Sequence, residues 1–147
     1  MTELEMFFAD NVEEVEEVSF TPSLRFKDKD GNPLAWKLKP LSPADNDKIK
    51  RQCMKRIRVV GNKGQFTEEF DQFKYALLLT VKTVTFPDLN NAQLQASWSK
   101  KAGFDIMTPE DLLQTMLTAG ELDELTNRCT EVSGYDDINE DVETAKN

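Results

Sequence analysis

Residues 86–135 are dense in side chains that stop and start helices, and this punctuation constrains the fold more than any other feature of the chain. Pro87 has no backbone N–H and moves Phe86 out of the α region, which predicts that the preceding helix ends at Phe86. Asn90, with Gln93 three residues later, resembles a capping box at the start of the next helix. The sequence therefore predicts several short, well-capped helices in this part of the chain.

Two further helices are predicted downstream. Thr108 and Pro109 form a typical N-cap and first turn, and Gly134 is placed to end the last helix. Apolar residues at helical spacing connect these signals. We expect helices at residues 91–98, 109–117 and 119–133, the last with an apolar stripe formed by Leu122, Leu125, Cys129 and Val132.

The first third of the chain has strand-like alternation instead. Leu24 and Phe26, followed by Leu34, Trp36 and Leu38, alternate with polar residues on either side of the turn-forming segment 28–32. This pattern predicts a β-hairpin. Its Asp-rich turn has the wrong spacing for a calcium loop, in which glycine is the sixth residue and an acid the twelfth. Before the hairpin, residues 4–15 favour a short helix and residues 18–20 a strand.

Two longer helices are predicted between these regions. The first begins at Ser42-Pro43 and places Ile49, Cys53 and Ile57 on its inner face. It ends at the glycines of the loop formed by residues 61–64. The second begins near Thr67, and its wide apolar stripe suggests the central helix of the domain. That stripe consists of Phe70, Phe73, Leu77, Val81 and Val84.

These predictions combine into an α+β fold, in which a small antiparallel sheet packs on a bundle of about five helices. We expect a single domain over residues 1–135, formed by an acidic N-terminal arm (1–20), the β-hairpin (21–41) and a helical region (42–134). Residues 136–147 are acidic and poor in apolar side chains, which is typical of a disordered tail.

Charge is strongly segregated along the chain. Residues 1–20 carry seven acids and no base, residues 21–66 carry twelve Lys or Arg and four acids, and the remainder is acidic, for a net charge of −9. Such segregation steers and orients partners. It also allows the acidic arm to lie on the basic segment of the same or a neighbouring subunit. The sequence leaves both interpretations open.

Catalysis is disfavoured by composition. The chain has no histidine, which removes the commonest general base and the commonest metal ligand. Cys53 and Cys129 fall on apolar stripes and are interpreted as buried, reduced thiols. The acidic clusters 68–71 and 121–124 lie at predicted helix starts, where acids are favoured electrostatically. We therefore expect no enzymatic activity, no metal and no cofactor.

A weak nucleic-acid motif is present. The loop Gly61-Asn62-Lys63-Gly64 lies between two predicted helices, like the backbone-clamping loop of a KH module, and has basic neighbours. Glycine is also common in helix-to-helix loops, and the net charge opposes affinity for nucleic acid. No apolar run has transmembrane length, and the N-terminus lacks the basic start of a signal peptide.

Short pieces along most of the chain resemble the XkdN-like phage tail assembly chaperones of PBSX-type phages and prophages. They lie at residues 25–28, 31–33, 36–38, 60–66, 75–79, 86–90, 92–95, 112–113, 116–117, 120–122 and 131–135. The resemblance implies a protein of the host bacterial cytoplasm that binds the tape measure protein, and possibly the tail tube protein, without remaining in the mature virion. It also implies possible self-association.

Within this resemblance, we expect client binding on an apolar groove rimmed by charge. The helix predicted from Ser42 carries basic residues on the face opposite Ile49 and Cys53, and this basic face would orient acidic client segments. Trp98, flanked by Ser and Lys, would face a partner. The candidate partner-binding residues are Lys48, Arg51, Lys55, Arg56, Arg58 and Trp98. The alternatives are a nucleic-acid-binding module that uses the 61–64 loop and a structural tail or neck protein.

Overall fold

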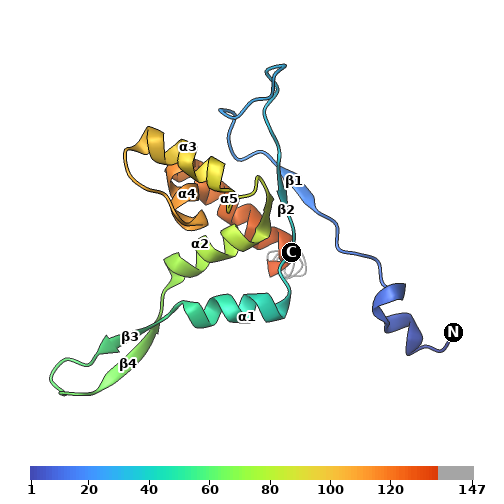
Figure 1. The fold of residues 1–147 in the computed structure, drawn as a ribbon. Helices are drawn as coiled ribbons and strands as arrows, with labels where there is room; N and C mark the ends of the chain where they lie inside the picture. Colours follow the sequence, from blue (N-terminus) through green and yellow to red (C-terminus); the bar gives the residue numbers. More distant parts are fainter. Residues whose placement is uncertain (136–147) are drawn as a thin grey trace, which may run out of the picture.

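The structure, a computed structural model, describes residues 1–135 and confirms the α+β fold (Figure 1). A three-stranded antiparallel sheet has the order β1-β2-β5, formed by Val18–Phe20, Trp36–Leu38 and Val84–Phe86. Phe20 faces Trp36, and Leu38 faces Val84. The prediction of a disordered tail concerns residues 136–147, which lie outside the described residues.

Five α-helices are present in residues 1–135: α1 (Pro43–Gln52), α2 (Gln72–Thr83), α3 (Ala92–Ala102), α4 (Pro109–Met116) and α5 (Ala119–Val132). Each helix begins at a residue whose side-chain oxygen accepts a hydrogen bond from the backbone N–H three residues later. The predicted caps Ser42 and Thr108 are confirmed. The predicted cap Asn90 is wrong by one residue, because Asn91 accepts from Leu94 N at 2.9 Å.

The main core lies where the three-stranded sheet meets the helices. The sheet contributes Trp36 and Leu38, and both side chains are buried. They belong to a cluster completed mainly by α4 and α5, which contribute fully buried leucines. Its other buried members are Val84, Leu89, Ile106, Leu112, Leu113, Met116, Leu117, Leu125 and Cys129.

The long helix predicted from Ser42 is wrong beyond Gln52. Met54–Arg58 form strand β3, which pairs antiparallel with strand β4 (Phe66–Phe70). Gly61 and Gly64, with φ of 88° and 78°, reverse the chain between the strands, a conformation that other L-residues rarely adopt. The paired residues lie between 8 (Arg58 and Phe66) and 16 (Met54 and Phe70) positions apart, so helical spacing alone does not reveal the pairing.

The second long helix begins and ends differently from the prediction. Residues expected in its first turn form β4, Asp71 caps α2, and the helix ends at Thr83 before strand β5. Its buried residues are Leu79, Thr80 and Thr83. Phe73, expected on the inner stripe, is 92% exposed.

The N-terminal third is also rearranged. Strand β2 pairs with β1, whereas the prediction paired it with the segment containing Leu24 and Phe26. The predicted hairpin forms only at its tip, where Lys27 bridges Pro33 and the Leu34 N–H donates to the Phe26 carbonyl at 2.8 Å. The turn at residues 28–32 does form, since the Asp28 carboxylate accepts from the N–H groups of Asp30 and Asn32. The helix expected over residues 4–15 is reduced to two short 3₁₀ turns, Glu5–Phe7 and Ala9–Asn11.

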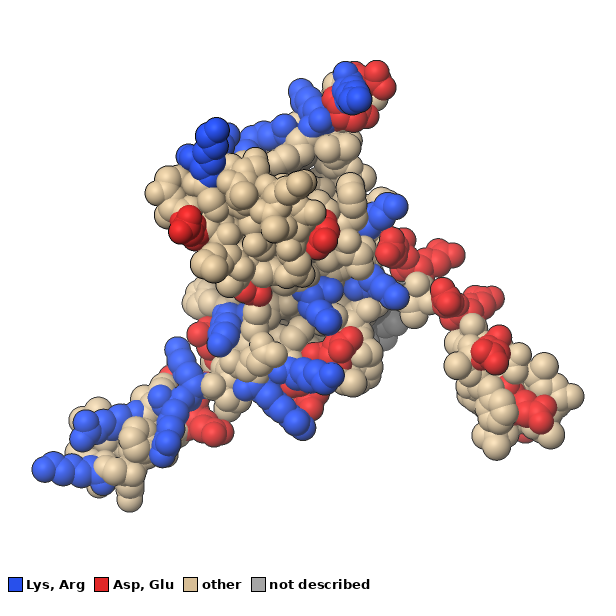
Figure 2. All heavy atoms as spheres, viewed as in Figure 1, with Lys and Arg blue, Asp and Glu red and all other residues tan. Residues whose placement is uncertain are grey.

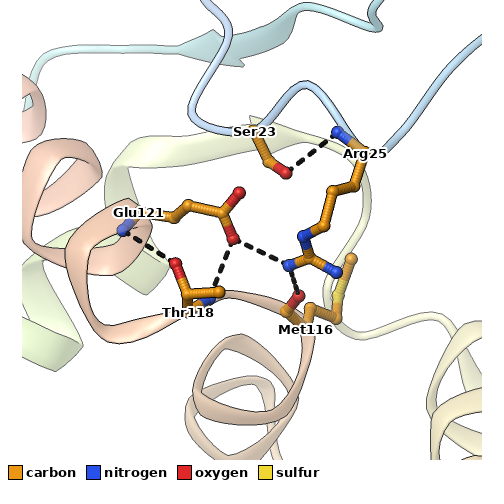
Figure 3. A network of polar contacts seen from close by, with 5 residues as sticks. All are labelled: Ser23, Arg25, Met116, Thr118 and Glu121. Atoms are coloured by element: carbon orange, nitrogen blue, oxygen red, sulfur yellow. Dashed lines mark hydrogen bonds and ion pairs between the residues drawn. The ribbon is translucent and has the colours of Figure 1, made fainter.

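A polar network ties the segment before the 28–32 turn to the helices (Figure 3). Arg25 donates to the backbone carbonyl of Met116, at the end of α4, and to the carboxylate of Glu121, in the first turn of α5. Glu121 also completes a capping box with Thr118. The network therefore fixes the sheet side of the molecule to the α4–α5 junction.

Candidate partner-binding surface

The β3–β4 hairpin projects from the helical body, to the lower left in Figure 1. Its base is closed by a hydrogen bond from Asp71 N to Cys53 O at 2.8 Å. No residue of β3 or β4 is fully buried, and neither strand pairs with the three-stranded sheet. The hairpin therefore contributes little to the core and is available for contacts with other molecules.

One face of this hairpin combines apolar and basic side chains. Directly opposed residues in an antiparallel pair share a face, and alternate residues along each strand do so as well. The pairs Met54–Phe70 and Arg58–Phe66 consequently lie on the same face as Arg56 and its cross-strand partner Glu68, the one acid that the two strands place there. The Arg56 guanidinium lies over the Phe66 ring at 3.9 Å from its centroid, a cation–π contact. Met54 and Phe66 each remain more than 40% exposed.

The same face continues onto α1. Lys50 and Arg51, in the last turn of α1, line an open hollow of about 360 Å³ together with Met54 and Phe70. A second hollow of about 510 Å³ shares Lys50 and Phe70 and extends along α2 and α5. We call this region the basic hairpin surface, formed by Lys50, Arg51, Met54, Arg56, Arg58, Phe66 and Phe70.

The predicted basic residues differ in how far neighbouring acids neutralise them. Arg51 pairs with Asp47 at 3.0 Å within α1. Lys55 points to the other hairpin face, where its Nζ lies 4.0 Å from Asp71. In the described part of the chain, Lys48, Arg56 and Arg58 have no ion pair within 4.0 Å. Figure 2 shows the resulting concentration of basic side chains over the hairpin and α1.

Three of the five predicted cations, Arg51, Arg56 and Arg58, thus lie on one surface. Lys48 is exposed on α1, and Lys55 points to the other hairpin face. Trp98 does not lie on that surface either. It lies on α3, beyond α2 from the hairpin in Figure 1, and packs on Phe26 with ring centroids 6.1 Å apart. Lys101 Nζ lies 5.2 Å from the Trp98 ring centroid. The side chain is half-buried against the core, and a partner contact through it stays a prediction.

The 61–64 loop has a different context from the one expected. A KH-type loop joins two helices, whereas Gly61 and Gly64 here join two strands. The helical setting that gave the loop its nucleic-acid interpretation is therefore wrong. Their positive φ angles are explained by the tight reversal of the hairpin.

The exposed apolar residues of the basic hairpin surface were missed from the sequence. Met54 falls within the long helix predicted from Ser42, and Phe66 lies between that helix and the one predicted from Thr67, so neither is expected on a shared strand face. A hairpin signal was present, since the β-branched run Ile57, Val59 and Val60 precedes the glycine-containing loop. Strand alternation from that run would have placed Met54, Arg56 and Arg58 on one face.

A metal site, reactive cysteines or a membrane-spanning helix in residues 1–135 would indicate other functions. No group of three or more His, Cys, Asp or Glu side chains is arranged to hold a metal. Cys53 and Cys129 are buried and free, as predicted, and burial raises the pKa of the Cys129 thiol to about 12. Over the same residues, no helix is both long and apolar enough to cross a bilayer.

Comparisons with known proteins agree with the resemblance seen in the sequence. The family model of the phage XkdN-like tail assembly chaperone protein matches residues 4–146. Two relatives come from Bacillus subtilis (strain 168). The protein YqbN is 26% identical over 97% of this chain and 91% of its own length, and the XkdN protein of the phage-like element PBSX is 25% identical over 99% and 94%.

The fold is shared with a solved structure. The crystal structure of YqbN superposes with a TM-score of 0.70 at 21% sequence identity, covering 92% of this chain and 99% of that one. Since the family model spans nearly the whole chain, assignment to the family does not depend on a local motif. The chain belongs to the phage XkdN-like tail assembly chaperone family.

Proposed function

We propose that this chain binds the tape measure protein during tail assembly and holds an amphipathic, acidic helical segment of that client on the basic hairpin surface. The observation that carries the proposal is the combination of exposed Met54 and Phe66 with Arg56 and Arg58 on one projecting face. An apolar strip rimmed by cations suits a helix that has an apolar face bordered by acids.

Apolar and charged contacts have separate roles in this proposal. The hollows beside Phe70 would take the client's apolar side chains and shield them from aggregation. The cations that lack an acidic partner, including Lys48, would orient the client and accelerate its association. Delivery of the shielded client to tail tube subunits would follow as a second step.

This mode of action needs reversible binding and no chemistry. We propose that the chain acts in the host bacterial cytoplasm as a non-enzymatic assembly factor and is released before the particle matures. A structural tail or neck component would instead stay in the virion. Mass spectrometry of purified particles separates the two roles, since the chaperone role requires that the chain be absent from them.

The client contact is tested by co-expressing this chain with the tape measure protein and capturing the complex at low salt. The triple variant Lys48→Glu, Arg56→Glu, Arg58→Glu should capture at least tenfold less client. The matched control reverses Lys27 and Lys29, at the 28–32 turn, and Lys37, in strand β2; all three are exposed as well. This control should capture as much client as the unmodified chain.

Equal losses in both variants would show that only the overall charge matters, and unchanged capture by the first variant would refute the orienting role. The apolar contact needs its own variant. Phe66→Ser removes an exposed ring from the basic hairpin surface without changing charge. It should weaken client capture at high salt, where the charged contacts are screened.

A further inference from the structure

The part of the N-terminal arm that precedes strand β1, residues 1–17, exposes an unusual number of large apolar side chains; below, the arm means these residues. Its two 3₁₀ turns bury no residue, and the arm extends away from the body in Figure 1. Monomeric proteins rarely leave such a surface uncovered. The exposed apolar residues of the arm are Met1, Leu4, Met6, Phe7, Phe8, Val12 and Val15.

The arm is also the most acidic part of the described chain. It carries seven acids and no Lys or Arg, and it forms a separate acidic projection in Figure 2. In residues 1–135, its one hydrogen bond to the body joins Glu17 to the Thr85 hydroxyl at 3.3 Å. The arm therefore presents apolar and acidic side chains together, with almost no contact to its own chain.

These properties are complementary to those of the basic hairpin surface. We infer that the acidic N-terminal arm of one copy binds the basic hairpin surface of a second copy of this chain. Phe7 or Phe8 would enter the hollow beside Phe70, whose lining atoms on the surface are apolar. Glu13, Glu14 and Glu16 would then face Arg56 and Arg58, which have no ion pair in the described part of their own chain.

The arrangement of the two parts favours contact between copies. The arm leaves strand β1 on one side of the body, and the hairpin projects from the opposite side (Figure 1). To reach its own hairpin, the arm would have to turn back at β1 and cross the helices. A neighbouring copy offers the same surface without that reversal, and the resulting contact joins two different patches, so that it is heterologous.

The contact between copies also has a consequence for client binding. This consequence, unlike the contact itself, rests on the proposed function. An acidic, apolar arm occupies the surface proposed for an acidic, apolar client helix. Arm and client should then compete for the basic hairpin surface, and the arm of a neighbouring copy would cover that surface until a client binds. The contact between copies itself does not require that any client bind there.

The experiment compares assembly by sedimentation velocity across a range of protein concentrations. The arm variant carries Glu13→Lys, Glu14→Lys and Glu16→Lys, and the hairpin variant carries Arg56→Glu and Arg58→Glu. Glu17 is left intact because of its bond to Thr85. The unmodified chain should associate in a concentration- and salt-dependent way, and each variant should associate at least tenfold more weakly.

A mixture of the two variants provides the decisive test. The basic arm of one then meets the acidic hairpin of the other, so that assembly should return in the mixture while each variant alone stays monomeric. Circular dichroism checks that each variant is folded. A monomeric unmodified chain, full assembly of the arm variant, or failure of the folded mixture to assemble would overturn the inference.

The two proposals fail separately. Removal of residues 1–16 should abolish assembly and increase client capture, since the competing arm is gone. If assembly depends on the arm but no variant captures the tape measure protein, the arm contact stands and the proposed function is refuted. If the truncated chain assembles like the unmodified one, the arm contact is refuted whatever the client does.

Discussion

The guanidinium of Arg25 and the carboxylate of Glu121 form an ion pair at 2.7 Å that joins residues 96 positions apart in the sequence (Figure 3). The same carboxylate oxygen accepts from the Thr118 N–H at 2.8 Å, and the same guanidinium nitrogen donates to the Met116 carbonyl at 2.6 Å. One shared contact thus closes the start of α5 and fixes the segment that leads into the 28–32 turn. The sheet is positioned on the helices partly by this contact.

The Glu121 side chain gives the fold a defined pH dependence. Hydrogen bonding to Arg25, assisted by Ser23 and the Thr118 backbone, lowers the pKa of Glu121 to about 2 from 4.5. A lowered pKa means that this stabilisation is complete above about pH 4.5 and is lost as pH falls toward 2. Glu121→Gln should lower the free energy of unfolding at pH 7 by about 1 kcal/mol, because the pair is partly exposed.

Urea unfolding of both proteins at several pH values measures this difference. It should shrink steadily between pH 5 and 2, because the unmodified carboxylate becomes protonated there. Glutamine retains the capping geometry, so the variant isolates the ion pair. Asp123→Asn, an exposed change on the same helix, is the control and should have little effect at pH 7. A difference that stays constant down to pH 2 would contradict the assignment.

Two apolar residues should differ sharply in their contribution to stability. Leu113 is fully buried in the core cluster, and Leu113→Ala should cost about 2 to 5 kcal/mol. Phe73 is 92% exposed, and Phe73→Ala should change the free energy of unfolding by less than about 0.5 kcal/mol. Both values come from denaturant unfolding. A large loss of unfolding free energy in Phe73→Ala would instead show that this side chain is buried, as helical spacing predicts.

The contrast between these residues illustrates what sequence reasoning could predict. Helix starts with strong local signals were predictable, since capping at Ser42 and Thr108 involves only neighbouring residues. The identity of strand partners was not. The pairing of β3 with β4, and of β1 with β2, depends on contacts between residues separated along the chain, which local spacing does not encode.

The same limit applies to the candidate site. Segregated charge was visible in the sequence and identified Arg51, Arg56 and Arg58 as surface cations. The apolar partners Met54 and Phe66 were missed, because they share a face with these cations only through strand alternation and cross-strand pairing. A helical interpretation of residues 54–60 distributes the same side chains differently around its axis.

The two thiols should be unreactive in the folded protein. Cys129 is fully buried, and burial also raises the pKa of Cys53 above its ordinary value. The thiolate is the reactive form, and little of it exists in either site near neutral pH. An aromatic disulfide reagent at pH 8 should therefore modify neither residue in the native state and both in guanidinium. Rapid reaction of one thiol without denaturant would show that the structure opens locally around it. The variant Cys53→Ser then identifies which of the two cysteines reacts.

The outer part of the hairpin should be separable from the rest of the fold. In an antiparallel ladder, hydrogen-bonded and non-hydrogen-bonded pairs alternate. Because Val59 bonds to Gln65 and Asp71 bonds to Cys53, the pair Ile57–Thr67 is also of the hydrogen-bonded kind. A two-residue Asn-Gly turn can connect such a pair. Replacement of residues 58–66 by Asn-Gly removes Arg58 and Phe66 but no buried side chain. The melting temperature should change by less than about 5 °C.

The shortened hairpin should nevertheless weaken both contacts proposed for it, as measured by client capture and by sedimentation, because Arg58 and Phe66 are gone. The matched control, Val60→Ser with Lys63→Ser, alters the loop and leaves the basic hairpin surface intact. It should retain both contacts, because neither residue lies on that surface. Large destabilisation by the shortening would mean that the hairpin supports the core. Full binding after the shortening would instead move both partners to another part of the molecule, such as the 690 Å³ hollow between α3 and the segment containing Phe104 and Met107.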